Sequence, residues 1–318
     1  MLGYIRGRLI QAVPVLIGIS MISFAVVRLA PGDPAALLVD VTNLTPQQQQ
    51  EIRVQLGLED PLPVQYVRML GSLVTGRLTS FRTGQSTIQM VLEAAPVTVL
   101  LVLSAVTTAV VVGISLGVIS SLRPYSGTDT VVTLLALLGL SVPQFWLGLL
   151  LIFVFAENLH WLPASGLRPV GSSGYNPIEM LPYLVLPTLV LATSMIASLT
   201  RYTRSGMLET LHQDYVRTAR AKGLAERRVI VGHALRNSLI TIVTLLGVLT
   251  PILLSGSVVV ESVFALPGLG RLAVGAAIGR DYPVVMTVNL LAAALVLLFN
   301  LMTDVAYTIV DPRIRVHE

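Results

Sequence analysis

The largest group of chemically useful side chains lies in one polar segment, residues 201–236, between two long apolar runs. The segment holds eight of the 21 Lys and Arg residues, including the only lysine of the sequence, Lys222. Basic side chains in this number bind acidic groups, either carboxylates of another protein or anionic lipid headgroups. We therefore expect this chain to meet an external partner at residues 201–236.

ATP hydrolysis by the chain itself is excluded by its lysine content. A P-loop needs the spacing G-x-x-x-x-G-K-[ST], because its lysine and backbone amides surround the phosphates. Lys222 stands in Ala-Lys-Gly instead, and the sequence has no second lysine.

Ser115 is the one candidate nucleophile, because Gly113-Ile-Ser-Leu-Gly117 matches the G-x-S-x-G turn of many hydrolases. That turn joins a strand to a helix, whereas Ser115 lies in the middle of an uninterrupted apolar run. The same residues match the G-x-x-x-G pattern through which membrane helices approach closely. The sequence favours packing, with an intramembrane hydrolase as the alternative that a serine-reactive probe would test.

The four histidines do not indicate a metal site, since none has an H-E-x-x-H partner. His160 stands beside Trp161, and we interpret this pair as an interfacial anchor. Polar residues within or beside apolar runs are candidates for lining a pathway or for packing: Gln144, Asn289, Asn300 and Asp304. Asp304 stands near the end of its run, which favours an ion pair with an arginine at the membrane surface.

The composition is that of a membrane protein. Of 318 residues, 54% are hydrophobic and 12% charged, whereas soluble domains carry about 25% charged residues. Six charge-free runs of at least 19 residues each suffice to cross a bilayer as a helix. The sequence therefore predicts an all-α protein with six transmembrane helices, at about 9–27, 97–121, 130–155, 182–200, 238–260 and 284–303.

Basic residues in short loops predict the orientation. With the N-terminus inside, the cytoplasmic segments carry 13 of the 21 basic residues, and the short outer loops carry only Arg168, Arg271 and Arg280. Both termini are therefore expected in the cytoplasm. The first apolar run is longer than the core of a cleaved signal, so we interpret it as a span. The net charge of +4 follows from this topology and does not indicate nucleic acid.

Residues 30–93 are predicted to form a small outer cap. Thr45-Pro-Gln-Gln48 matches a capping box that begins a first helix, which Gly57 ends. A second helix is expected from Pro63 to Gly76, and a third piece near Ser86. The cap is too small for a core of its own, so we expect it over the outer mouth of the bundle. It either seats a partner there or serves only as a cover.

Residues 201–236 predict two helices separated by a break. Four apolar residues recur at three-to-four spacing and give one apolar stripe along a basic helix: Leu208, Leu211, Tyr215 and Ala219. Gly223 is expected to end this helix with positive φ, and Leu224 follows as an exposed apolar residue. Residues 225–228 begin a second helix that continues to 235. Such a helix–Gly–helix elbow favours protein docking, with a basic amphipathic helix lying on anionic lipid as the alternative.

The same segment resembles the E-A-A-x-x-x-G…I-x-L-P signature of permease subunits of ABC importers. Gly223 is in register, Ala219 holds the third position and Leu235 matches the downstream part. Arg217, Thr218, His233 and Arg236 depart from the signature.

Other segments resemble the peptide/nickel branch of these permeases specifically. They are Arg28–Pro34, Asp214–Leu224, His233–Asn237, Val260–Arg271, Arg280–Val284 and Asp311–Ile314. The resemblance as a whole extends over nearly the whole chain. The insert after the first span is similar to the "B" permease of dipeptide and oligopeptide importers rather than to its "C" partner.

The resemblance implies a non-catalytic, multi-pass subunit of the bacterial cytoplasmic membrane that imports di- or oligopeptides. Nickel chelate, glutathione or another small solute is the alternative cargo. The implied partners are a homologous "C"-type permease, two cytoplasmic ATPase subunits that hold ATP and Mg, an extracytoplasmic substrate-binding protein and membrane lipid. No cofactor is expected on this chain itself. A stand-alone secondary transporter is the alternative from another class.

The resemblance also implies that residues 201–236 dock on the ATPases. The expected coupling residues are Tyr215, Arg217, Ala219, Lys222, Gly223, Leu224, Arg227, Arg228, His233 and Leu235. Leu224 is expected to fill an apolar pocket of the ATPase, with Arg217, Arg227 and Arg228 facing acidic groups around its rim.

Overall fold

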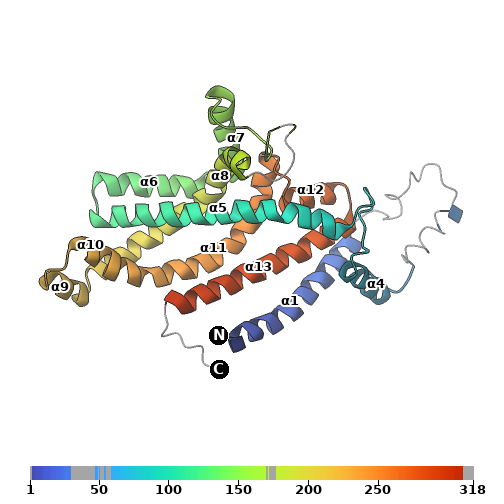
Figure 1. The fold of residues 1–318 in the computed structure, drawn as a ribbon, viewed down its shortest axis with the longest axis horizontal. Coiled ribbons are helices and arrows are strands. Elements are labelled where there is room, and N and C mark those ends of the chain that lie inside the picture. Colours follow the sequence, from blue (N-terminus) through green and yellow to red (C-terminus); the bar gives the residue numbers. More distant parts are fainter. Residues whose placement is uncertain are drawn as a thin grey trace. The chain divides into compact units, whose positions relative to one another are not determined.

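The computed structural model describes residues 2–29, 59–169, 171 and 177–310, together with 47, 48, 50 and 54. Across these residues the chain is helical, apart from turns and one isolated bridge between Thr79 and Ser86 (Figure 1). Among them, five helices are long and apolar enough to cross a membrane, or six if a sharply bent pair is one span. The all-α class is confirmed, and six spans are reached only by counting the bent pair.

The chain divides into two compact units, of which the first comprises residues 1–97 and 267–297. It contains α1 (Leu2–Leu29), α4 (Leu62–Val74), the start of α5 (Thr87–Leu122), α12 (Leu269–Ile278) and the first part of α13 (Tyr282–Val310). Its core is built from Val91, Ala94, Leu269, Ala276, Val284 and Val288. Most of the apolar surface of α1 is exposed, which suits a helix that lies in lipid.

The turn before α5 is fixed by Asp281, the residue that precedes α13. The buried carboxylate accepts hydrogen bonds from Ser80 Oγ and, at 3.0 Å, from the backbone N–H of Phe81. One turn along α13, Thr287 Oγ1 donates to Thr87 Oγ1 at 2.9 Å. The turn and the start of α13 are thereby held together.

The predicted cap is described only in part. α4 corresponds to the second predicted helix, and Gly76 beyond it has the positive φ of a helix stop, 71°. The third piece predicted near Ser86 is not a separate short helix, because α5 begins at Thr87 and continues without a break to Leu122. The capping box at Thr45 lies outside the described residues.

The second unit comprises residues 98–266 and 298–318. After the remainder of α5 it contains α6 (Gly127–Ser141), α7 (Gln144–Leu151), the π-helix η2 (Ile152–Asn158), α8 (Pro177–Leu211), α9 (Asp214–Ala221), α10 (Glu226–Arg228), the π-helix η3 (Val229–Leu235) and α11 (Arg236–Val263). In this unit α8 lies against both α6 and α11. α8 is also the helix that leads into residues 212–235.

Two glycines of α5 allow α8 to approach it closely. A Cβ added at Gly117 would lie 2.5 Å from Thr203 Cβ and 2.8 Å from the carbonyl oxygen of Thr200. A Cβ at Gly113 would lie 2.8 Å from Leu199 Cβ. The G-x-x-x-G pattern therefore serves helix packing, as the sequence favoured.

Ser115, between these glycines, does not have the setting of a nucleophile. Its side chain lies on the exposed face of an uninterrupted helix, and its Oγ donates to the carbonyl oxygen of Val111 at 2.6 Å. The sharp strand-to-helix turn that a G-x-S-x-G hydrolase requires is not formed here. These observations argue against the hydrolase alternative.

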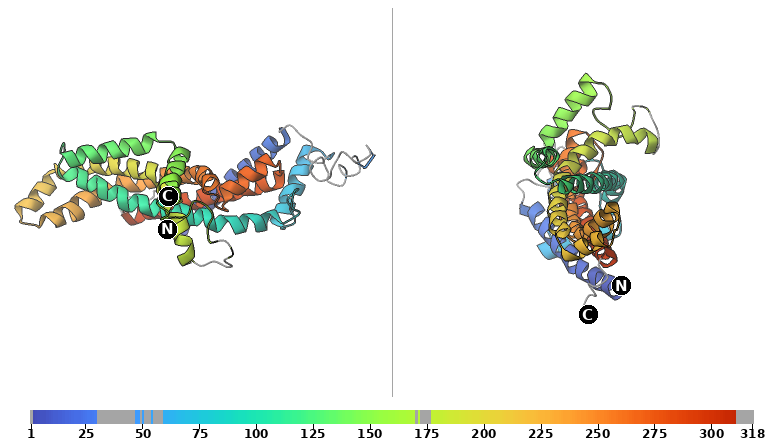
Figure 2. Two further views of the ribbon diagram at one scale, coloured as in Figure 1. Left: turned by 90° about the horizontal axis from the view of Figure 1, so that it is seen from above. Right: turned by 90° about the vertical axis from the view of Figure 1, so that its left-hand side faces the viewer.

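The third predicted span, residues 130–155, is not one straight helix. α6 ends at Ser141, α7 begins at Gln144, and the two axes differ by 108° (Figure 2). Pro143 explains the break, because it lacks a backbone N–H and disfavours helical geometry at the residue before it. Val142 accordingly has an extended backbone, with ψ of 125°.

Substituting Gly117 tests the close approach of α5 and α8. Gly117→Val is expected to destabilise the protein by roughly 1–3 kcal/mol, because the new side chain must displace backbone atoms of α8. The matched control is Gly127→Val in α6, where an added Cβ meets nothing within 4 Å. The measurement is the apparent melting temperature in detergent. Equal melting temperatures for the two variants would contradict the packing described here.

Candidate functional site

Residues 212–235, here named the elbow, join α8 to α11 at one end of the second unit (Figure 1). α8 ends at Leu211, Gln213 has an extended backbone with ψ of 149°, and α9 begins at Asp214. The single helix predicted across this stretch is therefore wrong. The break is local, since the N–H of Gln213 donates to the carbonyl of Thr210 at 3.0 Å and Asp214 provides the acidic first turn of α9.

The elbow has a small apolar core of its own. Val216, Ala219 and Val229 are buried, and Leu211 and Leu224 pack against them. The prediction for Ala219 was correct in placing it on the apolar face. Tyr215, in contrast, is 44% exposed, because the break before α9 turns Val216 inward in its place.

Leu224 was predicted to be exposed and is half-buried in this core. Its N–H donates to the carbonyl of Ala219 at 3.3 Å, while the N–H of Gly223 donates to the carbonyl of Arg220 at 2.9 Å. This pair of bonds is a Schellman motif, in which an apolar residue after the glycine commonly packs back on the helix. Leu224 thus stabilises the elbow by packing inside it and is not an exposed apolar side chain.

Gly223 adopts φ of +74°, which confirms the positive φ predicted for it. An added Cβ would meet nothing within 4 Å, so no neighbour would clash with a side chain. The requirement for glycine is therefore conformational, because L residues other than Asn and Asp rarely adopt this region.

An ion pair joins the two sides of the elbow. Arg220 Nη2 lies 2.7 Å from Glu226 Oε1, so the pair crosses the Gly223 turn. The hydrogen bond from Arg220 holds the pKa of Glu226 below its usual value, because it favours the ionised form of the carboxyl group. Both side chains are largely exposed, so the pair contributes little to the free energy of unfolding. Its main effect is to orient the two sides of the Gly223 turn relative to each other.

The ten predicted coupling residues divide into an outer and an inner set. Six are exposed: Tyr215, Arg217, Lys222, Gly223, Arg227 and Arg228. The other four are buried or half-buried: Ala219, Leu224, His233 and Leu235. The elbow therefore presents a basic surface with one aromatic side chain, supported by an apolar interior.

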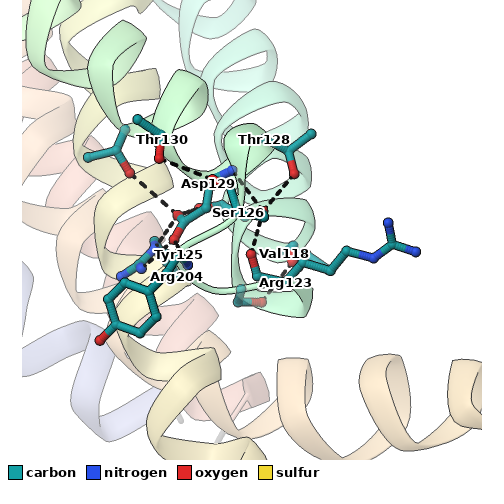
Figure 3. A network of polar contacts seen from close by, with 11 residues as sticks. Val118, Arg123, Tyr125, Ser126, Thr128, Asp129, Thr130 and Arg204 are labelled. Carbon is teal, nitrogen blue, oxygen red and sulfur yellow. Dashed lines mark hydrogen bonds and ion pairs between the residues drawn. The ribbon is translucent and has the colours of Figure 1, made fainter.

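α8 is tied to α6 by an ion pair that sequence reasoning missed. Arg204 Nε and Nη2 donate to Asp129 Oδ1 and Oδ2, each at 2.7 Å, and Asp129 is 3% exposed (Figure 3). Ser120 Oγ also donates to Oδ1, and the N–H of Tyr125 donates to Oδ2 at 2.8 Å. The carboxylate therefore connects the end of α5, the α5–α6 turn, the start of α6 and α8.

A weak signal for Asp129 exists in the sequence. Ser126-Gly-Thr-Asp129 matches the [ST]-x-x-[DE] start of a helix, and Ser126 Oγ accepts from the N–H of Asp129 at 3.3 Å. The match predicts a helix start and does not identify Arg204 as the partner.

The predicted pathway residues do not gather at one place. Gln144 is half-buried at the start of α7, and its Oε1 would lie 3.2 Å from a Cβ added at Gly256 of α11. Asn289 and Asn300 are exposed on α13, and Asp304 on the same helix is half-buried. Their role in a pathway stays a prediction.

Another buried carboxylate lies in α11. Glu261 is fully buried, and its Oε1 accepts a hydrogen bond from Thr98 Oγ1 at 2.7 Å. In the sequence it stands directly after the fifth apolar run and within the resembling segment Val260–Arg271, and neither feature predicted its burial.

Known proteins support the class that this fold and elbow define, a membrane permease. The family model "Binding-protein-dependent transport system inner membrane component" matches residues 109–316, and "Binding-prot-dependent transport system membrane comp, N-term" matches residues 1–102. The chain therefore belongs to the family of binding-protein-dependent transport system inner membrane components. It is a multi-pass inner-membrane protein, and the predicted resemblance is confirmed.

Full-length relatives are found among curated permeases. The chain is 43% identical to the oligopeptide transport system permease protein AppB of Bacillus subtilis (strain 168), over 99% of each chain. It is 39% identical to the di/tripeptide transport system permease protein DppB of Pseudomonas aeruginosa (strain UCBPP-PA14), again over 99% of each. The fold is similar to that of the inward-facing MetNI methionine ABC transporter, with a TM-score of 0.58 and 19% identity over 70% of this chain and 97% of the other.

The conformation of Gly223 gives a test of the elbow itself. Gly223→Val is expected to open the elbow, because a β-branched residue in the left-handed region costs at least roughly 1–2 kcal/mol. Gly223→Asn is the matched control, since Asn tolerates this region. Limited tryptic cleavage of membrane vesicles at residues 217–228 measures the effect. Equal cleavage rates for Val and Asn would show that the positive φ is not required.

Proposed function

We propose that the chain is one of two permease subunits of an ATP-driven importer of di- and oligopeptides. The observation that carries this cargo is the similarity to oligopeptide and di/tripeptide permeases over the full length of both chains. In this proposal the chain is non-catalytic and binds no cofactor. ATP and Mg are held by two ATPase subunits, and a homologous permease forms the other half of the path.

The proposal orients the chain by its basic residues. The elbow carries Arg217, Arg220, Lys222, Arg227 and Arg228 within twelve residues, which favours its retention in the cytoplasm. Both termini then lie on the cytoplasmic side. The segment after α1, residues 30–93, lies on the opposite side, where it helps seat the substrate-binding protein.

The elbow is the proposed docking site for an ATPase. Its inner residues fix its shape, and its exposed residues Tyr215, Arg217, Arg227 and Arg228 are available to acidic groups of a partner. Binding of anionic lipid would use the same charges, but it needs no fixed turn between two helices. The rigid Schellman turn at Gly223 therefore favours a protein partner.

Charge reversal at the elbow separates these two partners. Arg227→Glu combined with Arg228→Glu is expected to reduce co-purification of the ATPases about ten-fold or more, since opposed like charges at an interface cost several kcal/mol. The matched control is Arg123→Glu, an exposed arginine of the α5–α6 turn whose side chain points away from Asp129 (Figure 3).

Permease levels in the membrane should be unchanged in both variants. If the ATPases bind the double variant normally, the elbow contacts lipid and does not dock a protein.

The cargo is tested by uptake through the complete transporter in proteoliposomes with its binding protein. Labelled di- and tripeptides are expected to accumulate only when ATP is present on the ATPase side. Unlabelled peptide should compete with them, whereas nickel chelate and glutathione should not. If glutathione or nickel chelate is taken up and peptide is not, that solute is the cargo in place of peptide. Uptake by the permease without ATPases would favour a secondary transporter.

A further inference from the structure

We propose that Asp129 and Arg204 are positioning residues that make α6 follow α8 when the elbow moves. The inference rests on the proposed function, because it takes the elbow as the point where the ATPases act. In this proposal, the two residues transmit a movement of the elbow through α6 to the bend between α6 and α7.

The first step is the connection from the elbow to Arg204. α8 is continuous from Pro177 to Leu211, so Arg204 lies seven residues, about two helical turns, before the end of the helix. Between these points α8 touches the chain that leaves the elbow, since a Cβ added at Gly206 would lie 3.3 Å from Ser238 of α11. A displacement of the elbow therefore reaches the end of α8 through Leu211, which packs in the core of the elbow, and continues to Arg204 along the helix.

The second step is the connection from Arg204 to α6. The two parallel hydrogen bonds of the guanidinium fix both the distance and the angle between the groups, which a single point contact would not. The carboxylate is itself held by Ser120 Oγ and by the N–H of Tyr125, so it does not rotate freely. Movement of Arg204 must then carry the start of α6 and the α5–α6 turn with it.

The third step leads along α6 to the bend. α6 runs from Gly127 to Ser141, and Pro143 separates it from α7. Beyond the bend, Gln144 lies against Gly256 of α11. A shift of α6 therefore changes the position of α7 and of the Gln144 amide relative to α11, inside the apolar part of the unit.

An ion pair is a costly means of merely joining two helices. Removing two charges from water carries a desolvation penalty that their attraction often fails to exceed, and apolar residues would hold α6 and α8 together equally well. Such packing is already present, since a Cβ added at Gly139 of α6 would lie 3.0 Å from Thr193 Cγ2 of α8. What the bidentate pair adds to this packing is a fixed direction of contact between the two helices.

A distance measurement tests the link directly. The sequence has no cysteine, so spin labels can be attached at Val131→Cys in α6 and Ser205→Cys in α8, both at exposed positions. In the complete transporter the label distance is expected to be the same without nucleotide and with ATP trapped by hydrolysis-deficient ATPases. Adding Asp129→Asn should make the two states differ. A distance that already changes in the intact pair, or one that stays constant with Asp129→Asn, would overturn the proposal.

A functional measurement distinguishes positioning from simple stabilisation. Asp129→Asn and Arg204→Lys are expected to lower peptide transported per ATP hydrolysed at least ten-fold, while the ATPases still co-purify. Arg204→Lys keeps the charge but loses the two-pronged geometry, so it tests the directional link even if Asp129→Asn fails to fold. The matched control is Arg201→Lys, at an exposed arginine one turn earlier in α8, which should leave the ratio unchanged.

If transport and hydrolysis fall together with the amount of complex, the pair only stabilises the fold and the proposal is wrong. Failure of the elbow variants to release the ATPases would instead overturn the proposed function, so the two failures are distinguishable.

Discussion

The polar end of the second unit depends on one constraint, that a charge placed among apolar helices must be neutralised within the protein. Asp129 meets this constraint through Arg204, with its side chain only 5% exposed. The ion pair between Arg220 and Glu226, by comparison, lies on exposed surface. The Asp129 pair therefore fixes the end of α5 and the start of α6 against α8, about two turns before α8 ends and the elbow begins.

Packing in the rest of this unit follows from small residues and a proline. Gly113 and Gly117 let α5 and α8 approach until backbone and Cβ atoms meet, which apolar side chains alone would prevent. Pro143 ends α6 and redirects the chain by 108° into α7. The unit thus combines one closely packed helix pair, α5 and α8, with one bend between α6 and α7.

The sequence predicted those features that depend on local chemistry. Charge-free runs identify apolar helices because hydropathy adds up along neighbouring residues, and Gly223 identifies a turn because its backbone freedom is intrinsic. Pro143 was visible as well, but membrane helices tolerate proline, so its position alone did not predict a bend of this size. Tyr215 was misplaced because the extended Gln213 restarts the helix, and Leu224 because the Schellman turn at Gly223 folds it back onto the core of the elbow. Asp129 and Arg204 are 75 residues apart, and nothing local pairs them.

The structure of the elbow also decides which residues are free to hold a partner. Val216, Ala219, Val229 and half-buried Leu224 are used to fold it, so its shape is formed before any partner arrives. A preformed surface loses little conformational freedom on binding, which leaves more of the contact energy for affinity. In the proposed docking, that energy comes from the exposed basic residues and from Tyr215, whose ring offers apolar area and a hydroxyl. Leu224 contributes indirectly, because it stabilises the turn that places those side chains on one surface.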